Sequence, residues 1–254
     1  MQTSRLIVPE WLDSLPVDDP RAQASRRDLR RLNSIMGHRG CFRRTLLQHL
    51  AKTPPKRLAE IGAGDGTFLL ALASQLRGQW PGVEVTLVDL HPVVTPKTLE
   101  AFRSIGWVAK VEVVDVFDWA SRCDPFDVVM ANLFLHHFPD NALRSLFQLL
   151  SSRAKLFMSC EPRRSNVGIA ASRLLGLIGC NDVTRHDGPV SVRAGFRGTE
   201  LSRLWVSSPE WWMEESRKGL FSHFFVASRK PRLENIPNGM APASRFSGAG
   251  AGSK

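Results

Sequence analysis

A glutamate followed by three alternating glycines is the stretch of this 254-residue chain best suited to ligand chemistry. The string "EIGAGDG" spans residues 60–66 and joins an apolar run of strand character to a run of helical character. A triphosphate-binding loop would read GxxxxGK[ST], and no GK[ST] follows Gly66. A dinucleotide-binding turn would read GxGxxG or GxGxxA, but Thr67 stands at its third position. An acid ahead of the glycines instead favours a ligand that carries a cation and few negative charges.

S-adenosylmethionine has those properties, because its methionine end carries an ammonium and a carboxylate and the molecule has no phosphate. Glycines permit positive φ and let the backbone come close to a ligand. Amides at the start of a helix over residues 67–77 can receive the carboxylate, and Glu60 would attract the ammonium. The alternative that Glu60 only caps the turn stays open. The residues expected in this part of the cofactor site are Glu60, Gly62, Ala63, Gly64 and Gly66.

Two further acids fall where the adenosine part of this cofactor would need them. Asp89 ends the second expected strand, 23 residues beyond Gly66, near the offset of about 20 residues at which an acid holds ribose hydroxyls. Asp115 ends the third expected strand, where its carboxylate would accept the adenine amino group, although Asp118 is an alternative. Asp89 also reads as a turn residue before His91-Pro92. The residues expected around adenosine are Asp89, Leu90, Asp115, Val116 and Phe117.

Histidines supply the candidate for proton removal from a hydroxyl acceptor, because imidazole accepts protons near neutral pH. His136 and His137 follow the fourth expected strand, and adjacent side chains on a helix or turn diverge, so one of the two should face the cleft. We favour His137. His186 is a further candidate, with Asp182 or Asp187 to orient its ring, and His223 is another. For each histidine the alternative is a residue that only packs or makes a backbone hydrogen bond.

Alternating strands and helices must position these residues. Apolar and β-branched runs predict strands over 57–62, 83–90, 111–117, 126–134 and 154–162, and helical periodicity separates several of them. The segment 210–230 predicts two more strands around a turn at Lys218-Gly219. This order indicates an α/β fold: a Rossmann-like, doubly wound, seven-stranded, mostly parallel sheet with a C-terminal antiparallel hairpin and ligands at the carboxyl ends of its strands.

The flanking segments are expected to form the acceptor side. Residues 1–50 predict a helical lead-in and cap, irregular up to residue 24 and then two helices broken from Gly37 to Gly40, with Phe42 as an apolar contact for the acceptor. Residues 51–230 form the main domain. Within it, 163–209 predict an inserted lid: an apolar helix over 167–180, a polar loop over 181–196 and a helix with Thr199 as its N-cap. The tail 231–254 predicts disorder.

The motifs "EIGAGDG", "LVDLHP", "VVDVFDW" and "FDVVMANLFLHHFPD" together resemble the class I S-adenosylmethionine-dependent methyltransferases of the bacterial, small-molecule type. The resemblance covers roughly residues 57–162 and the closing hairpin. It implies that Asn132 and Leu133 join the acids and glycines above around the cofactor. The segment "ANLFLHHF" is unlike the [DN]PP[YF] motif of enzymes that methylate exocyclic amino groups of nucleic-acid bases. A looser similarity of the insertion to methyltransferases of polyketide or quinone-like products implies secondary metabolism.

Composition bounds the partners. The formal net charge is +10, but residues 51–160 carry equal numbers of basic and acidic side chains, so the surplus lies on the flanks and nucleic acid is disfavoured. The four cysteines have no CxxC spacing, which predicts neither a disulfide framework nor a metal site. No apolar run reaches the roughly 18 residues of a membrane span, and we see no secretory signal, so a cytoplasmic location is expected. A homodimer is left open.

The sequence therefore predicts a methyltransferase that uses S-adenosylmethionine to methylate an oxygen of a small phenolic, polyketide-like or quinone-like acceptor. Arg185 and Arg193 would hold an acidic or carbonyl group of that acceptor. Two alternatives remain. One is an RNA or protein methyltransferase, supported by the basic flanks, and the other is a cofactor-binding protein without turnover.

Overall fold

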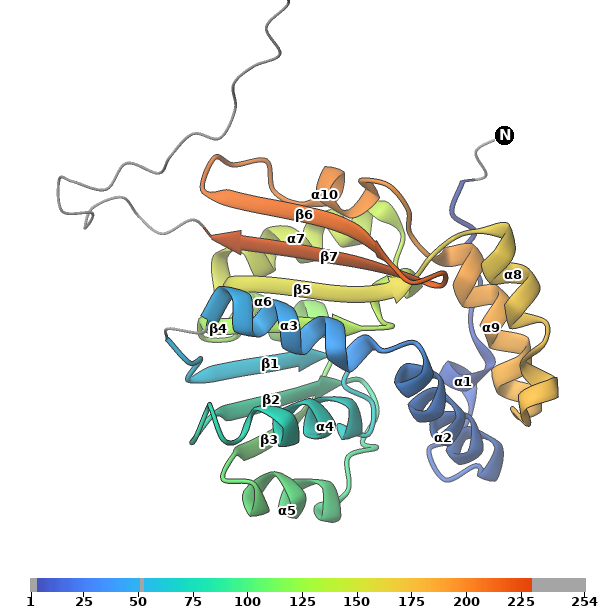
Figure 1. Cartoon of the computed structure of the whole chain (residues 1–254), viewed down its shortest axis with the longest axis horizontal. Coiled ribbons are helices and arrows are strands. Elements are labelled where there is room, and N and C mark those ends of the chain that lie inside the picture. Colours follow the sequence, from blue (N-terminus) through green and yellow to red (C-terminus); the bar gives the residue numbers. More distant parts are fainter. Residues whose placement is uncertain (1–3, 51–52, 230–254) are drawn as a thin grey trace, which may run out of the picture.

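A seven-stranded sheet forms the centre of the computed structural model, which describes residues 4–50 and 53–229 (Figure 1). The strand order is β3-β2-β1-β4-β5-β7-β6, with β7 antiparallel to β5 and to β6 and the other pairs parallel. The predicted fold, with its closing hairpin, is confirmed, while the tail 231–254 lies outside the described residues. The strands are β1 (Arg57–Ile61), β2 (Glu84–Asp89), β3 (Val108–Val113), β4 (Phe126–Asn132), β5 (Ala154–Pro162), β6 (Trp211–Lys218) and β7 (Ser222–Arg229).

Helices cover both faces of the sheet and one of its ends. One face packs on α3, α4 and α5 through Phe42, Leu69 and Phe102, and the other on α6, α7 and α10. In Figure 1, α1, α2, α8 and α9 gather beyond the carboxyl ends of the parallel strands. The helices are α1 (Trp11–Ser14), α2 (Pro20–Ile35), α3 (His38–Leu50), α4 (Thr67–Leu76), α5 (Pro96–Ser104), α6 (Val116–Arg122), α7 (Asp140–Arg153), α8 (Asn166–Ser172), α9 (Asp182–Ala194) and α10 (Glu200–Leu204), with short 3-10 helices η1 (Leu135–His137) and η2 (Leu175–Ile178).

The sheet reverses its strand order between β1 and β4. These two strands are neighbours and buried along nearly their whole length, as parallel strands covered on both faces are. The chain leaves β1 toward α4 on one face and leaves β4 toward α7 on the other. Such a divergence opens a crevice at the carboxyl ends of the strands, which is where open α/β sheets bind ligands.

The N-terminal helices begin and end differently from the prediction. The helix α2 starts at Pro20, inside the stretch predicted as irregular, because Asp19 caps it and the fixed φ of proline suits the first turn. The break before α3 is confined to Met36 and Gly37, and Gly40 lies inside the helix. A short helix that the sequence analysis omitted, α6, follows β3 with Asp115 as its N-cap.

The polar segment predicted as a loop is the helix α9. Its N-cap is Asn181, whose side chain accepts from the amide of Thr184. The prediction was wrong because Gly188-Pro189 reads as a turn in sequence, whereas here Pro189 is accommodated within the helix. The apolar helix before it is divided into α8 and η2. In the following helix, the Thr199 side chain makes no capping hydrogen bond within the described chain, and Glu215 on β6 accepts from the amides of Leu201 and Ser202 instead.

Buried carboxylates join the N-terminal segment to the insertion. Asp187 on α9 accepts from the amides of Trp11 and Leu12 at 2.9 and 3.0 Å. Asp28 on α2 accepts from the amide of Asn181 at 2.8 Å. Each carboxylate therefore satisfies backbone donors at a helix start of the other segment. The two segments that were predicted separately as cap and lid thus form one layer; their roles in acceptor binding remain predictions.

His38 fixes α3 to the end of the sheet. Its ring is fully buried, donates from Nδ1 to Oδ1 of Asn132 at 2.8 Å and accepts at Nε2 from the Ser222 hydroxyl at 2.7 Å. Both contacts suit the neutral imidazole, and burial lowers the pKa of His38 to about 4.

No helix among the described residues combines the length and apolar character that crossing a bilayer would require.

The stability of the fold should therefore depend on pH through His38. Its pKa is depressed in the folded chain and near 6.5 when unfolded, so the unfolded state binds more protons between these values. The contribution is complete above about pH 6.5 and falls by up to about 3 kcal/mol as the pH drops toward 4. Denaturant unfolding at pH 7 and pH 5 measures it. The His38→Gln variant should lose this part of the pH dependence, and an unchanged difference between the two pH values would contradict the assignment.

Candidate functional site

A cavity of about 430 Å³ opens at the carboxyl ends of β1, β2 and β4, on the crevice expected from the topology. Its volume lies in the range of small-molecule sites. The structure brings together seven of the twelve residues predicted for the cofactor. The predicted residues that line the cavity are Glu60, Gly62, Ala63, Gly64, Asp89, Asn132 and Leu133. The remaining five, Gly66, Leu90, Asp115, Val116 and Phe117, do not line it.

Glu60 lies at the base of this cavity. Its side chain is fully buried, and Oε2 has no hydrogen-bond partner among the described residues. Burial, followed by the negative charges of Asp65 and Asp89, raises the pKa of Glu60 well above its ordinary value. A buried polar atom without a partner is costly unless a ligand supplies one. An ammonium group would do so and would also offset the carboxylate charge, so the residue fits the cofactor predicted from the sequence.

The three glycines of the turn share a positive φ but differ in the space that a side chain would have. All three have positive φ, of 64° at Gly62, 55° at Gly64 and 73° at Gly66. A Cβ on Gly62 would lie 2.1 Å from the ring of Phe134, and one on Gly66 would lie 2.8 Å from Leu87. A Cβ on Gly64 would meet no described atom within 4 Å. Gly64 therefore presents bare backbone to the cavity, where a ligand can approach it closely.

Asp89 holds the turn against the end of β2. Its Oδ2 accepts from the amide of Gly64 at 2.7 Å and its Oδ1 accepts from the amide of His91 at 2.9 Å. Each carboxylate oxygen has further lone pairs, which suit the hydroxyls of a ribose. The turn-residue reading and the ligand reading of Asp89 are therefore compatible.

Asp115 does not share the cavity with Glu60 and Asp89. Its carboxylate accepts from the amide of Phe117 at 2.7 Å and caps α6, so β3 ends before it, at Val113. Phe117 packs edge-on against Phe138. The expectation that acids from three strand ends line one cavity is thus met by two of them, because the third acid serves a helix start instead.

The end of β4 carries a backbone distortion at the cavity. Leu133 has φ of 55°, the only positive value at a non-glycine residue in the described ranges. Its amide donates to the carbonyl of Cys160, which holds the distortion in place. Asn132 just before it accepts from His38 and donates to Oδ1 of Asn33 at 3.2 Å. Strained backbone of this kind often occurs at functional sites.

The facing wall, called the α2 wall below, comes from α2, the segment before it and the start of α3. Leu12, Arg26, Leu29, Asn33 and Arg39 line the cavity from this side. A further residue of this wall, Arg30, pairs with Asp65 of the glycine turn and so ties α2 to the cofactor side. Sequence analysis expected residues 1–50 on the acceptor side but named none of these lining residues, because Arg, Asn and Ser at helical spacing read as a solvated face.

Three acceptor contacts expected from the sequence lie elsewhere. Phe42 is in the core, where it packs edge-on against Phe68 and Phe224, so it is not an acceptor contact. Arg185 and Arg193 are exposed and do not line the cavity.

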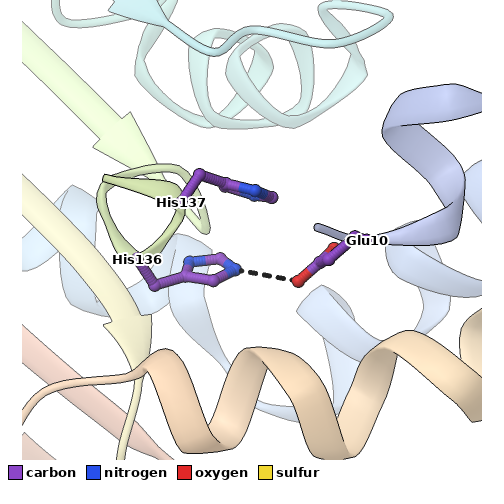
Figure 2. A group of neighbouring side chains, drawn as sticks. All are labelled: Glu10, His136 and His137. Carbon is purple, nitrogen blue, oxygen red and sulfur yellow. Dashed lines mark ion pairs between the residues drawn. The ribbon is translucent and has the colours of Figure 1, made fainter. Parts of the chain in front are cut away.

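His136 is buried between the carboxylates of Glu10 and Glu161, and Figure 2 shows its ion pair with Glu10. Its Nδ1 donates to Oε2 of Glu161 at 2.8 Å, and its Nε2 lies 3.4 Å from Oε1 of Glu10. Burial disfavours the charged ring, but the two carboxylates outweigh this and raise the pKa of His136 to about 9. Burial likewise disfavours the Glu10 carboxylate, and the bond to His136 lowers the pKa of Glu10 to about 2. Without another ligand, this pair is ionised at neutral pH, so His136 is a poor proton acceptor.

The other histidines differ in their access to the cavity. His137 is partly exposed, and its Nδ1 lies 3.2 Å from Asp13, which lines the cavity. His186 donates from Nδ1 to Asp187 at 2.8 Å and stacks on Trp11 with ring centroids 3.8 Å apart. His223 is buried against Glu215. None of the histidines 136, 137, 186 and 223 is itself among the cavity-lining residues, and His137 comes nearest to them through Asp13.

Comparison with known proteins agrees with this geometry. A family model described as "Methyltransferase domain" matches residues 59–156. A trans-aconitate 2-methyltransferase of Mycolicibacterium gilvum is 34% identical over 104 residues, which are 41% of this chain and 36% of that protein. The match therefore spans about a third of the length of that relative.

Solved methyltransferases share the fold. The plantazolicin methyltransferase in complex with SAH superposes with a TM-score of 0.61 at 13% identity, over 84% of this chain and 92% of that one. The magnesium protoporphyrin IX methyltransferase of Synechocystis with bound SAH gives a TM-score of 0.51 at 14% identity, over 77% and 83%. Sequence motifs, strand order and family match agree: residues 59–156 match a methyltransferase domain, and the sheet has the fold of class I S-adenosylmethionine-dependent methyltransferases.

Proposed function

We propose that this protein binds S-adenosylmethionine in the cavity above Glu60 and transfers its methyl group to an oxygen of a small phenolic, polyketide-like or quinone-like acceptor. The single observation that carries the proposal is the buried Glu60 carboxylate, which has an unpartnered oxygen in a cavity flanked by a glycine turn. The family match and the cofactor product bound in related folds support it.

The chain's own residues would orient the cofactor. Glu60 receives the ammonium, the amides at the start of α4 receive the carboxylate, and Asp89 receives the ribose hydroxyls. The cofactor supplies a methyl group on a sulfonium, which is a good leaving group. What the protein must add is alignment of the acceptor oxygen with the S–CH₃ bond and exclusion of water, and orientation of this kind contributes up to roughly 7–11 kcal/mol.

The wall formed by α2 suits an acceptor with an apolar body and an acidic or carbonyl group. Leu12 and Leu29 supply apolar surface, and Arg26 and Arg39 supply cationic donors at the same cavity. The substrate for which the relative is named, trans-aconitate, is an acid and is compatible with these arginines.

His137 is the histidine best placed to activate the acceptor hydroxyl. Asp13 lies 3.2 Å from its Nδ1, which leaves Nε2 to receive the proton. His136 is held as an ion pair, and His186 is stacked on Trp11. We therefore retain His137 as the proposed catalytic residue and place His136 and His186 as residues that position the surrounding segments.

Methyl transfer from cofactor labelled in its methyl group tests the function directly. We expect label in small acceptors that carry a phenol or an enol, measured by separation of the product after incubation with the full chain. RNA and a mixture of proteins serve as parallel acceptors. Label that appears only in RNA or protein would refute the proposed acceptor class.

Glu60→Gln should weaken cofactor binding roughly 10- to 100-fold, because a hydrogen bond to a charged group contributes about 1.5–3 kcal/mol. Isothermal titration calorimetry measures the Kd. Burial raises the pKa of Glu60, and pairing with the ammonium requires the carboxylate, so the Kd of the unmodified chain should fall as the pH rises toward that pKa. The Kd of Glu60→Gln should lack this dependence on pH.

Asp124→Asn is the matched control for this experiment, because Asp124 is an exposed acid at the opposite, amino end of β4. It should bind the cofactor with unchanged Kd. Equal Kd values for Glu60→Gln and the unmodified chain would remove Glu60 from the cofactor site.

His137→Ala should lower kcat by about 10²- to 10⁴-fold, the usual contribution of general acid-base catalysis. The Kd for the cofactor should change little, because His137 does not line the cavity and is connected to it only through Asp13. His186→Ala is the comparison variant, since it removes a ring that stacks on Trp11 without facing the cavity. A larger loss of kcat in His186→Ala than in His137→Ala would overturn the assignment.

A further inference from the structure

Glu10, His136 and His137 form a cluster that the proposed methyl transfer does not explain. Glu10 immediately precedes α1, and the two histidines end η1, so the cluster joins segments far apart in sequence. One potential ligand atom from each side chain lies within 4.8 Å of the other two. Figure 2 shows the three side chains converging from the two segments on one point.

The spacing in this cluster suits a small cation. Two nitrogen or oxygen ligands at about 2.0–2.1 Å from one tetrahedral Zn²⁺ lie about 3.3 Å from each other. Nε2 of His136 and Oε1 of Glu10 are 3.4 Å apart. The ring centroids of His136 and His137 are 4.3 Å apart, and one ring nitrogen of each lies within 4.8 Å of the other and of a Glu10 carboxylate oxygen.

The donor set also has a defined preference. Two imidazoles and one carboxylate form the ligand set of zinc sites that keep a fourth position open for water or substrate. Imidazole ligands favour Zn²⁺ and neighbouring first-row cations over Mg²⁺ and Ca²⁺, which prefer oxygen ligands.

Carboxylates behind the histidines provide an independent observation. Glu161 is fully buried, accepts from Nδ1 of His136 at 2.8 Å, and is itself held by the amides of Phe134 and Leu135. This contact fixes the ring orientation and leaves Nε2 facing the cluster. A histidine that donates its other ring nitrogen to a carboxylate is the usual support of a metal ligand. Asp13 provides a second carboxylate, 3.2 Å from Nδ1 of His137.

We propose that Glu10, His136 and His137 bind one divalent cation of the zinc class, with Glu161 as the carboxylate that orients His136. The cation replaces the proton on Nε2 of His136 and links the N-terminal segment to the end of β4. The sequence analysis expected no metal because it searched for cysteine spacing, whereas these ligands are an adjacent histidine pair and a glutamate more than a hundred residues away.

The site also bears on acceptor activation, a step that rests on the proposed function. One of its ligands, His137, is paired with Asp13, which lines the cavity, so a cation held there would lie near the acceptor. A cation there lowers the pKa of a bound hydroxyl. With the cation bound, His137 would serve as its ligand, and the proton-accepting role proposed above for His137 applies to the chain without the cation.

Titration of the metal-stripped full chain with ZnCl₂ tests the proposal. Calorimetry should show one Zn²⁺ per chain, and Co²⁺ in its place should give the visible absorption of a four-coordinate site. Glu10→Gln and His137→Asn are the test variants, because both side chains are less buried than His136 and their loss is less damaging to the fold. Each should weaken Zn²⁺ binding by roughly 100-fold or more, since loss of an outer-shell partner alone costs about 10- to 100-fold.

His49→Asn is the matched control, because His49 is a partly buried histidine on α3, outside the cluster. It should bind Zn²⁺ as the unmodified chain does. The proposal fails if the unmodified chain binds no Zn²⁺, or if both test variants bind it with unchanged affinity.

The methyl-transfer assay separates this proposal from the proposed function. Transfer by a chain that binds no Zn²⁺ overturns the cation site and leaves the methyltransferase proposal standing. Stoichiometric Zn²⁺ binding that both test variants lose supports the cation site even where no acceptor is methylated.

Discussion

The cavity at the carboxyl ends of the strands contains a buried carboxylate with an oxygen that has no hydrogen-bond partner among the described residues. Glu60 lies near the end of β1, just before the glycine turn. Because this strand is covered on both faces, the Glu60 side chain cannot reach solvent. Desolvation and two nearby acids oppose its charge. The stability lost there is offset by the apolar core around it, and such local conflicts typically occur at functional sites. Asp89, Gly64 and Asn132 line the same cavity as this group.

The opposite side of the cavity is built by other buried acids, each of which satisfies backbone donors across a segment boundary. Asp187 holds the start of α1, Asp28 holds the start of α9, and Glu161 holds η1 together with His136. Charge-assisted bonds to backbone amides are stronger than neutral ones and directional. They explain how the N-terminal helices and α9 are held in place relative to one another and to the sheet.

Much of the sheet and its turn was predictable, because hydrophobic period and glycine spacing are local signals. The motif 60–66, Asp89 and the hairpin around Lys218-Gly219 needed no knowledge of distant contacts. The α2 wall, the helix α9 and the cluster around His136 were not predictable in this way. Their residues read as a solvated face, a turn and isolated histidines until the fold places Glu10 and Asp187 beside them. Asp115 is the opposite case. Its position after an apolar run suggested a ligand contact, but its carboxylate caps the helix α6.

The attachment of Arg5 implies an order of events during folding. Its guanidinium donates to the carbonyl of Ala194 at 2.8 Å and lies over the ring of Phe196, so the first described residues meet a part of the chain 189 positions later. Contacts of such long sequence separation close after local ones. On a ribosome that emits the N-terminus first, the glycine turn and β2 are complete well before the segment that receives Arg5 has been made. The glycine turn is therefore complete early in synthesis, and the attachment of the N-terminal segment through Arg5 comes last.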